Sequence, residues 1–358
     1  MDHRIIKVIP GLLAHPLRAL NLARYWLHKT ERNETVGYLP FVLDIEPTTF
    51  CNFKCRMCHV SDPDFVHHHM PLDLFKRIIN DNPQLIKIHL QGMGEPLLCP
   101  QLFDMISYAD RKRILIQTTT NGSMLNEPNV RKLINARLTS IGISIDGATA
   151  GTFESIRQCS DFGKVVEGVK RLVAEKRKAR ANTIIRAWTV VQKENANEAE
   201  GIVRLCKEIG FDCLVFQLFI SGWGKTDWSA KNSGKQLDIA CAKDQIEKAV
   251  SLGKQLDFNV RMHTGDIYSR QKPCSWPWYS AFISADGFMV PCCILGDSRI
   301  KNFGNIQEKK LSVVWNSQPY RAFRTMHMNN AIPPFCRNCY DSADTGKAPA
   351  QSSESLVP

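Results

Sequence analysis

The feature that most constrains the fold is a regular alternation of short β-branched segments with helical ones between residues 40 and 265. Six candidate strands lie at 41–46, 86–91, 114–119, 140–145, 183–191 and 213–219. The intervening segments, such as 72–80, 130–136, 162–178 and 197–209, carry apolar residues at helical spacing. Such alternation builds a parallel sheet with right-handed crossovers. We therefore predict an α/β fold, a partial (β/α)6 TIM-like barrel, with its active site at the carboxyl ends of the strands.

Thirteen cysteines form the second constraint, and they do not suit disulfides. An odd number cannot all pair within one chain, and disulfides do not persist in a reducing cytosol. The first residues lack the pattern of a secretory signal, and no uncharged stretch reaches about 18 residues, the length needed to span a bilayer. We therefore predict a cytoplasmic protein whose cysteines bind a metal or a cluster.

A first set of cysteines, Cys51, Cys55 and Cys58, directly follows the first predicted strand in the run CNFKCRMC. Three thiolates at these gaps can hold three irons of a [4Fe–4S] cluster, and the fourth iron then stays open for chemistry. One alternative is covalent haem attachment through CRMCH, but that chemistry belongs to exported proteins and leaves Cys51 unexplained. The other is a zinc knuckle completed from the histidines at 67–69.

Three further motifs follow later strands in order: QGMGEP at 91–96, TTNG at 119–122 and SIDG at 144–147. Together with the first cysteine set they resemble the radical S-adenosylmethionine (radical SAM) superfamily over about residues 40–265. The resemblance implies reductive cleavage of SAM at the catalytic cluster, which gives a 5′-deoxyadenosyl radical able to take hydrogen from a C–H bond. It implies that the first cysteine set binds that cluster. The SAM contacts that it implies are Gly94, Glu95, Asn121, Ser144, Arg186 and Asn195.

A second set of cysteines, Cys274, Cys292, Cys336 and Cys339, lies beyond the predicted barrel. Its layout resembles the SPASM and twitch extensions of radical SAM enzymes, which carry auxiliary [4Fe–4S] clusters. No cysteine follows Cys339, so the layout is similar to the shorter, single-cluster form. Four thiolates would close that cluster, which suits electron transfer. The alternative is structural zinc, for which four cysteines are a usual ligand set.

The chain divides into four predicted parts: a basic amphipathic segment at 1–39, the radical SAM core at 40–265, a small cysteine-rich SPASM/twitch domain at 266–340 and a disordered tail at 341–358. In the first part, an apolar stripe at helical spacing consists of Leu13, Leu17, Leu20 and Leu27. Two interpretations of this stripe stay open: docking on the protein's own core, and peripheral contact with a membrane surface.

The net charge of +11 fits nucleic acid, anionic lipid or an acidic substrate. Its densest run, at 170–180, follows a helical pattern and is not interleaved with aromatic residues, so it offers no stacking platform for single strands. We therefore predict no nucleic-acid partner. A zinc-binding nucleic-acid module and an iron–sulfur electron carrier stay as remote alternatives.

Only about 40 residues precede the first strand, too few for the packed leader-peptide module that many peptide maturases carry. This favours a hydroxyl-rich small molecule, such as a sugar or an aminocyclitol, which the enzyme would dehydrogenate or epimerise. The alternative is a maturase that modifies a ribosomally made peptide or protein. Either reaction needs a reducing partner such as flavodoxin or ferredoxin.

The exit of the sixth strand is predicted to form the substrate pocket. Its residues are Gln217, Trp223 and Trp228, with Trp276 and Tyr279 closing it. Four further residues are candidates for catalysis: Cys159 and Cys293 as hydrogen donors, with Lys225 and Asp227 beside the pocket. The alternative for residues 221–235 is a long solvated loop.

Overall fold

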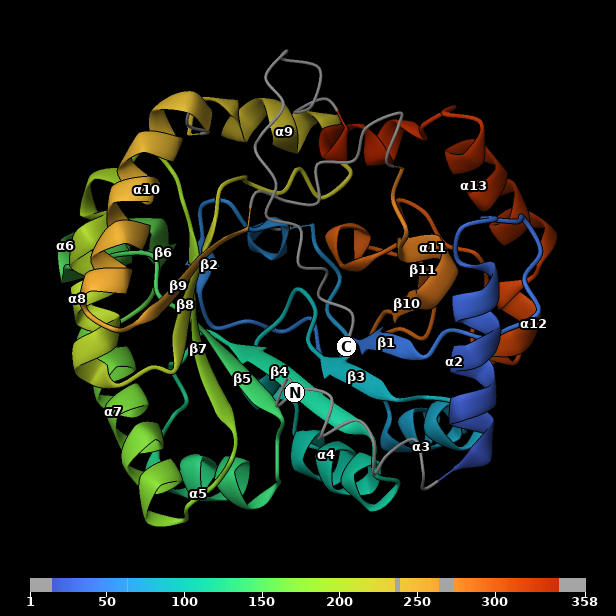
Figure 1. Ribbon diagram of the computed structural model, residues 1–358, viewed down its shortest axis with the longest axis horizontal. Coiled ribbons are helices and arrows are strands. Elements are labelled where there is room, and N and C mark those ends of the chain that lie inside the picture. Colours follow the sequence, from blue (N-terminus) through green and yellow to red (C-terminus); the bar gives the residue numbers. More distant parts are fainter. Residues whose placement is uncertain (1–14, 63, 236–238, 264–272, 341–358) are drawn as a thin grey trace.

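The computed structural model describes residues 15–62, 64–235, 239–263 and 273–340, so Leu13 and the predicted tail at 341–358 lie outside the described residues. Its centre is a nine-stranded sheet that curls into an open barrel (Figure 1). In the order of the sheet, the strands are β11 (Met289–Val290), β10 (Ser280–Ile283), β1 (Val42–Ile45), β3 (Lys87–Leu90), β4 (Leu115–Thr120), β5 (Ser140–Ser144), β7 (Ile184–Val190), β8 (Cys213–Gln217) and β9 (Asn259–His263).

All six predicted strands are present, and they pair in parallel from β1 to β8. The prediction of an α/β fold with a partial TIM-like barrel is therefore confirmed. The sequence patterns missed the other three strands of this sheet. β9 adds a seventh parallel strand beside β8, β10 pairs in parallel with β1, and β11 turns back antiparallel to β10.

Helices cover the outside of this sheet (Figure 1). Those of the barrel are α3 (Leu72–Asp81), α4 (Leu102–Arg111), α5 (Glu127–Asn135), α6 (Ala150–Ile156), α7 (Phe162–Lys178), α8 (Ala199–Ile209), α9 (Thr226–Ser233) and α10 (Ile239–Gln255). The stretch at 221–235 is therefore partly helical, not only a loop. The C-terminal helices are α11 (Trp276–Tyr279), α12 (Leu311–Trp315) and α13 (Gln318–Met328).

The two faces of each strand have different roles. In β3, Ile88 and Leu90 are fully buried, whereas Lys87 and His89 alternate with them and are only half-buried. The same alternation runs along β4 and β7. Because successive side chains point to opposite faces, the apolar set packs under the helices and the polar set lines the barrel interior.

The C-terminal cysteine-rich part is joined directly to the barrel sheet. Because β10 is parallel to β1, the residues before it lie at the amino end of β1, where the amide of Phe41 donates to the carbonyl of Tyr279 at 3.2 Å. The residues after β10 lie at the carboxyl end, where the amide of Glu46 donates to the carbonyl of Ile283 at 2.9 Å. The direction of β10 therefore decides which residues can reach the barrel mouth.

The N-terminal helix α2 (Pro16–His28) docks on the barrel through a side that combines polar residues with the buried ring of Tyr25, which contacts Phe41. The buried Arg18 side chain donates to three backbone carbonyls, and Asn21 exchanges two hydrogen bonds with the backbone of Leu39. By contrast, Leu17 and Leu20 are about half exposed. The expectation that the leucine stripe itself docks on the core is wrong, because saturated polar contacts hold the opposite side of the helix. None of the described helices is long and apolar enough to cross a membrane.

Candidate functional site

The first cysteine set lies on the loop that leaves β1. Cys55 is buried in the short strand β2 (Lys54–Cys55), which pairs with β6 (Arg157–Gln158), while Cys51 and Cys58 are half-buried. Burial raises the pKa of Cys51 to about 11 and that of Cys58 to about 12, and the neighbouring thiols contribute to both rises. Thiols with such pKa values become thiolates at neutral pH when a metal centre binds them.

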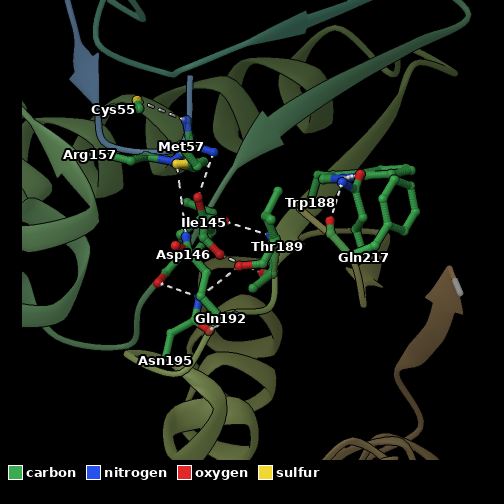
Figure 2. A network of polar contacts seen from close by, with 12 residues as sticks. Cys55, Met57, Ile145, Asp146, Arg157, Trp188, Thr189, Gln192, Asn195 and Gln217 are labelled. Atoms are coloured by element: carbon green, nitrogen blue, oxygen red, sulfur yellow. Dashed lines mark hydrogen bonds and ion pairs between the residues drawn. The ribbon is translucent and has the colours of Figure 1, made fainter. Parts of the chain in front are cut away.

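Nitrogen donors surround these sulfurs. The Nη1 atom of Arg157 lies 3.9 Å from Cys55 Sγ, and the Nδ2 atom of Asn121 lies 3.9 Å from Cys51 Sγ. Arg157 is held by an ion pair with the fully buried Asp146, at 2.7 Å (Figure 2). Donors of this kind stabilise negative charge on metal-bound sulfur. Three grouped thiols with donors on their sulfurs therefore fit an iron–sulfur cluster.

The two tryptophans predicted to contact substrate are instead joined to this cysteine loop. The indole nitrogens of Trp223 and Trp228 both donate to the carbonyl of Met57, at 2.9 and 3.3 Å. Trp228 is buried and Trp223 is half-buried. Because each indole has a single N–H, neither side chain has a hydrogen-bond donor left for a substrate. Both side chains fix the backbone between Cys55 and Cys58, and contact of their rings with a substrate stays a prediction.

Gly94 and Glu95, two of the predicted SAM contacts, connect three loops at the carboxyl ends of the strands. A Cβ atom on Gly94 would lie 2.4 Å from the carbonyl oxygen of Thr48, so glycine is required by packing on the loop that leads to Cys51. The buried carboxylate of Glu95 accepts from Thr120 Oγ1 and from the backbone of residue 121, both at 2.6 Å. Its Oε2 atom has one such donor and can accept a second, from an ammonium group for example.

The other predicted SAM contacts differ in what they offer. Asn121, beside Cys51, and Ser144, half-buried at the end of β5, lie at the barrel mouth. Arg186 lies in β7 within electrostatic reach of Lys87, which begins β3. Both N–H donors of Asn195 are used, because Nδ2 donates to two backbone carbonyls, and Oδ1 accepts from one backbone amide (Figure 2). These bonds shape the loop after β7, and the expected position of Asn195 beside the adenosyl group stays a prediction.

The second cysteine set brings together chain segments from both ends of the C-terminal part. Cys274 precedes α11, Cys292 follows β11, and Cys336 and Cys339 lie in a 3₁₀ turn at Pro334–Cys339. Burial raises the pKa of the thiols of Cys292, Cys336 and Cys339. For Cys292 and Cys336, the neighbouring thiols of the set raise the pKa further. The Nε2 atom of His327 lies 4.0 Å from Cys336 Sγ. The donor set fits a second cluster in the same way as the first.

Among the described residues, no three cysteine, histidine or acidic side chains are arranged to bind one metal ion together. A cluster does not need that arrangement, because each thiolate binds a different iron.

The four catalytic candidates occupy different places. Cys159 lies on an exposed turn after β6 with φ of 63°, which places it at the surface beside the first cysteine loop. Lys225 pairs with Asp62 at 3.6 Å, and Asp227 is exposed in the first turn of α9. The structure therefore brings neither Cys159 nor Asp227 into the barrel. Cys293, which is half-buried, does lie within electrostatic reach of Asp44 in β1.

The remaining predicted substrate residues lie at opposite ends of the barrel. Gln217 ends β8 at the mouth, where its Oε1 atom accepts from the indole of Trp188 at 3.1 Å (Figure 2). Trp276 and Tyr279 precede β10, and Tyr279 contacts the aromatic ring of Phe41 at 6.1 Å. The prediction that this pair closes the substrate pocket is wrong, because a strand parallel to β1 puts them at its amino end.

The barrel interior contains an acid–base pair that the sequence patterns did not predict. The Nδ1 atom of His89 in β3 lies 2.7 Å from Oδ1 of Asp44 in β1, and Asp44 is almost fully buried. The Nε2 atom of His89 is buried and has no hydrogen-bond partner among the described residues. Alternation along the two strands was the available signal, since it places both side chains on the interior face.

Two family models match the chain. Residues 45–222 match the radical SAM superfamily, and residues 274–340 match SPASM, an iron–sulfur cluster-binding domain. The chain belongs to the radical SAM superfamily and carries a C-terminal SPASM domain. Its cofactors are accordingly S-adenosylmethionine and two [4Fe–4S] clusters.

Relatives with assigned roles cover most of the chain. A tungsten-containing aldehyde ferredoxin oxidoreductase cofactor-modifying protein of Pyrococcus furiosus is 24% identical over 318 residues, 83% of this chain and 86% of that protein. The PqqA peptide cyclase of Gluconobacter oxydans is 28% identical over 310 residues, 84% of this chain and 82% of that protein. The crystal structure of Streptococcus suis SuiB bound to precursor peptide SuiA has a TM-score of 0.66 at 17% identity. The match covers 86% of this chain and 71% of the SuiB chain, and at 17% identity it shows only that the two proteins have the same fold.

Proposed function

We propose that this radical SAM enzyme is a maturase that modifies a ribosomally made peptide or protein, with oxidation of the modified residue. The observation that carries the oxidative part is the Asp44–His89 pair on the interior face of the barrel, on strands whose exits lead to the first cysteine loop and to the QGMGEP motif. The relation to a PqqA peptide cyclase over most of both chains supports the peptide as substrate.

The length of the chain ahead of the barrel does not exclude a peptide substrate. A short lead ahead of the barrel favoured a sugar or an aminocyclitol over a peptide. The PqqA peptide cyclase aligns over 84% of this chain and 82% of its own length, so the two chains are of nearly equal length. A short lead therefore does not separate peptide from small-molecule substrates.

The chain's own residues have clear roles in such a reaction. Cys51, Cys55 and Cys58 would hold the catalytic cluster, and Cys274, Cys292, Cys336 and Cys339 the auxiliary one. Bound SAM with a reduced cluster supplies the radical chemistry that removes hydrogen from an unactivated carbon.

When the substrate is then oxidised, it must release a proton together with the electron. His89 can accept that proton at Nε2, because the carboxylate of Asp44 beside it stabilises the positive charge that the ring then carries. Cys274, Cys292, Cys336 and Cys339 would hold an iron–sulfur centre able to take up that electron, and a flavodoxin or ferredoxin would supply the electron that starts each turnover.

The test uses anaerobic holoenzyme with dithionite, SAM and extract fractions from the organism that makes the protein. A peptide fraction should stimulate 5′-deoxyadenosine formation, and prior protease digestion should abolish the stimulation. A carbohydrate fraction that stimulates equally, with no effect of protease on either fraction, would refute a peptide substrate and return the sugar hypothesis.

A further inference from the structure

The outward side of helix α2 is apolar, the reverse of what a surface helix on a soluble protein usually shows. Leu17 and Leu20 are 47% and 48% exposed, Trp26 is 50% exposed, and Leu27 is 74% exposed. The helix buries Arg18 instead, at 3% exposure. A contiguous apolar surface of this kind on one helix marks an interaction site more often than isolated exposed leucines do.

These side chains have no part in holding the helix in place. Arg18 donates to the carbonyls of Pro83, Lys112 and Arg113 at 3.3, 2.8 and 3.0 Å, and Asn21 donates to and accepts from the backbone of Leu39. Together these contacts fix both the position and the rotation of α2. The contacts that hold α2 therefore come from its inward side, and the apolar side chains on its outward side stay exposed.

Cations border this apolar surface at both ends. At one end, the Arg18 contacts bring the exposed run Arg111, Lys112 and Arg113 against the first turn of α2. At the other, the Nζ atom of Lys29 lies 3.4 Å from the centre of the Trp26 ring. Arg24 is exposed on the outward side as well.

Acidic groups are few around the same surface. Glu31 is the sole acid between residues 15 and 33, and it pairs with His28 at 2.9 Å. Asp110 directly precedes the basic run. The charge around the apolar surface is therefore predominantly positive.

We propose that α2 rests on an anionic membrane surface, with Leu17, Leu20, Trp26 and Leu27 in the interface and the flanking cations on lipid phosphates. Leucine and tryptophan on one side with lysine and arginine at the edges is the composition of helices that lie in the plane of a bilayer. A two-fold contact between two copies of the protein would set the same cationic rim against itself, which disfavours a dimer through α2. A helix that projects its apolar side outward also offers no groove to a peptide.

Vesicle flotation of the full-length holoprotein tests this proposal. Vesicles of phosphatidylcholine with about 30% phosphatidylglycerol should bind it, phosphatidylcholine alone should bind it at least about 10-fold less, and added salt should weaken binding. A triple variant, Leu20→Gln, Trp26→Gln and Leu27→Gln, should lose binding by about 10-fold or more. Its cleavage of SAM should stay unchanged, because these side chains are exposed and belong to neither cysteine set.

The matched control is Val313→Gln on α12, another exposed apolar side chain at 57% exposure, which should bind vesicles like the wild type. Replacing Arg111, Lys112 and Arg113 with Gln should reduce both the affinity and its salt dependence. Equal flotation of the triple variant and the wild type would overturn the proposal. A wild type that is a dimer and a triple variant that is a monomer in light scattering would also overturn it, because a second copy of the protein would then cover the apolar side of α2. Loss of binding on removal of residues 1–14 with full binding by the triple variant would also overturn it.

Discussion

The Nδ1 atom of His89 lies 2.7 Å from Oδ1 of Asp44, and the two residues are register partners on adjacent parallel strands. Asp44 is 1% exposed, and its Oδ1 atom makes no hydrogen bond within the described residues, so the contact with His89 is an ion-pair approach. The other ring nitrogen, Nε2, is also buried without a partner among the described residues. The pair therefore has the form of a base whose protonated state a neighbouring carboxylate stabilises.

We expect His89→Gln to lower product formation by about 100-fold or more, because general-base catalysis contributes factors of this size. Formation of 5′-deoxyadenosine without product should persist, since the substitution leaves both cysteine sets intact. Asp44→Asn should act in the same direction, because it removes the negative charge that stabilises protonated His89, and it should also change the pH profile of product formation. Parallel assays of 5′-deoxyadenosine and product by mass spectrometry measure this uncoupling.

The matched control is His28→Gln, at an exposed histidine that also pairs with an acid, Glu31. This variant should keep the wild-type ratio of product to 5′-deoxyadenosine. A His89→Gln enzyme with that same ratio would remove the pair from the reaction.

Arg157 gives the second prediction, because it is a buried cation between Asp146 and the sulfur of Cys55. Arg157→Met should lower the free energy of unfolding by about 3 to 5 kcal/mol, since it leaves a buried carboxylate without its partner. It should also speed the loss of iron from the first cysteine set. Adding Asp146→Asn should recover part of the stability.

The exposed pair of Arg131 and Glu127 provides the comparison. Arg131→Met should cost about 0.5 kcal/mol or less in the same denaturation experiment, because exposed ion pairs contribute little. Equal losses from the two arginine variants would contradict the role given to Arg157.

Much of the fold could be predicted from the sequence because local patterns specify it. The strands at 41–46 and 114–119 were visible as β-branched runs, and the spacing of Cys51, Cys55 and Cys58 identified the loop after β1. Each of these signals lies within a few neighbouring residues. The resemblance to radical SAM enzymes, which these motifs carry, implied the cofactors.

The failed site predictions concern long-range geometry. Trp276 was placed beside the substrate because it is close to Cys274 in sequence, but the parallel pairing of β10 with β1 carries it to the other end of the barrel. The Asp44–His89 pair was missed because two strands 45 residues apart set its register. The direction of the leucine stripe of α2 stayed open between core and surface because three distant carbonyls, which satisfy Arg18 inside the protein, decide it.

Glu46 gives a pH-dependence prediction. Burial raises its pKa from 4.5 to about 8, although two backbone amides donate to its carboxylate. Between these two pH values the unfolded chain releases a proton that the folded protein keeps, so stability should fall as pH rises through this window. The contribution is largest below pH 4.5 and lost by about pH 8.

Glu46→Gln should remove this fall, which amounts to a relative change on the order of 5 kcal/mol. Thermal unfolding of the anaerobic protein across the window measures it. Glu167→Gln, at an exposed position, should keep the wild-type profile. A Glu46→Gln protein with the wild-type profile would mean that another group controls the pH dependence.

The two cysteine sets predict about eight irons and eight sulfides per anaerobically reconstituted chain. A variant with Cys51, Cys55 and Cys58 replaced by Ala should keep half of each and should form no 5′-deoxyadenosine. Replacing Cys274, Cys292, Cys336 and Cys339 should remove the other half. Zinc in place of iron in the second set after anaerobic purification would exclude an auxiliary cluster.

The transfer of deuterium into 5′-deoxyadenosine tests the central claim most directly. Peptides and small carbohydrates are isolated separately from cells of the source organism grown in deuterated medium, and each fraction is given to the holoenzyme in ordinary water. We predict deuterated 5′-deoxyadenosine from the peptide fraction and none from the carbohydrate fraction. Deuterium from carbohydrates alone would contradict a peptide maturase.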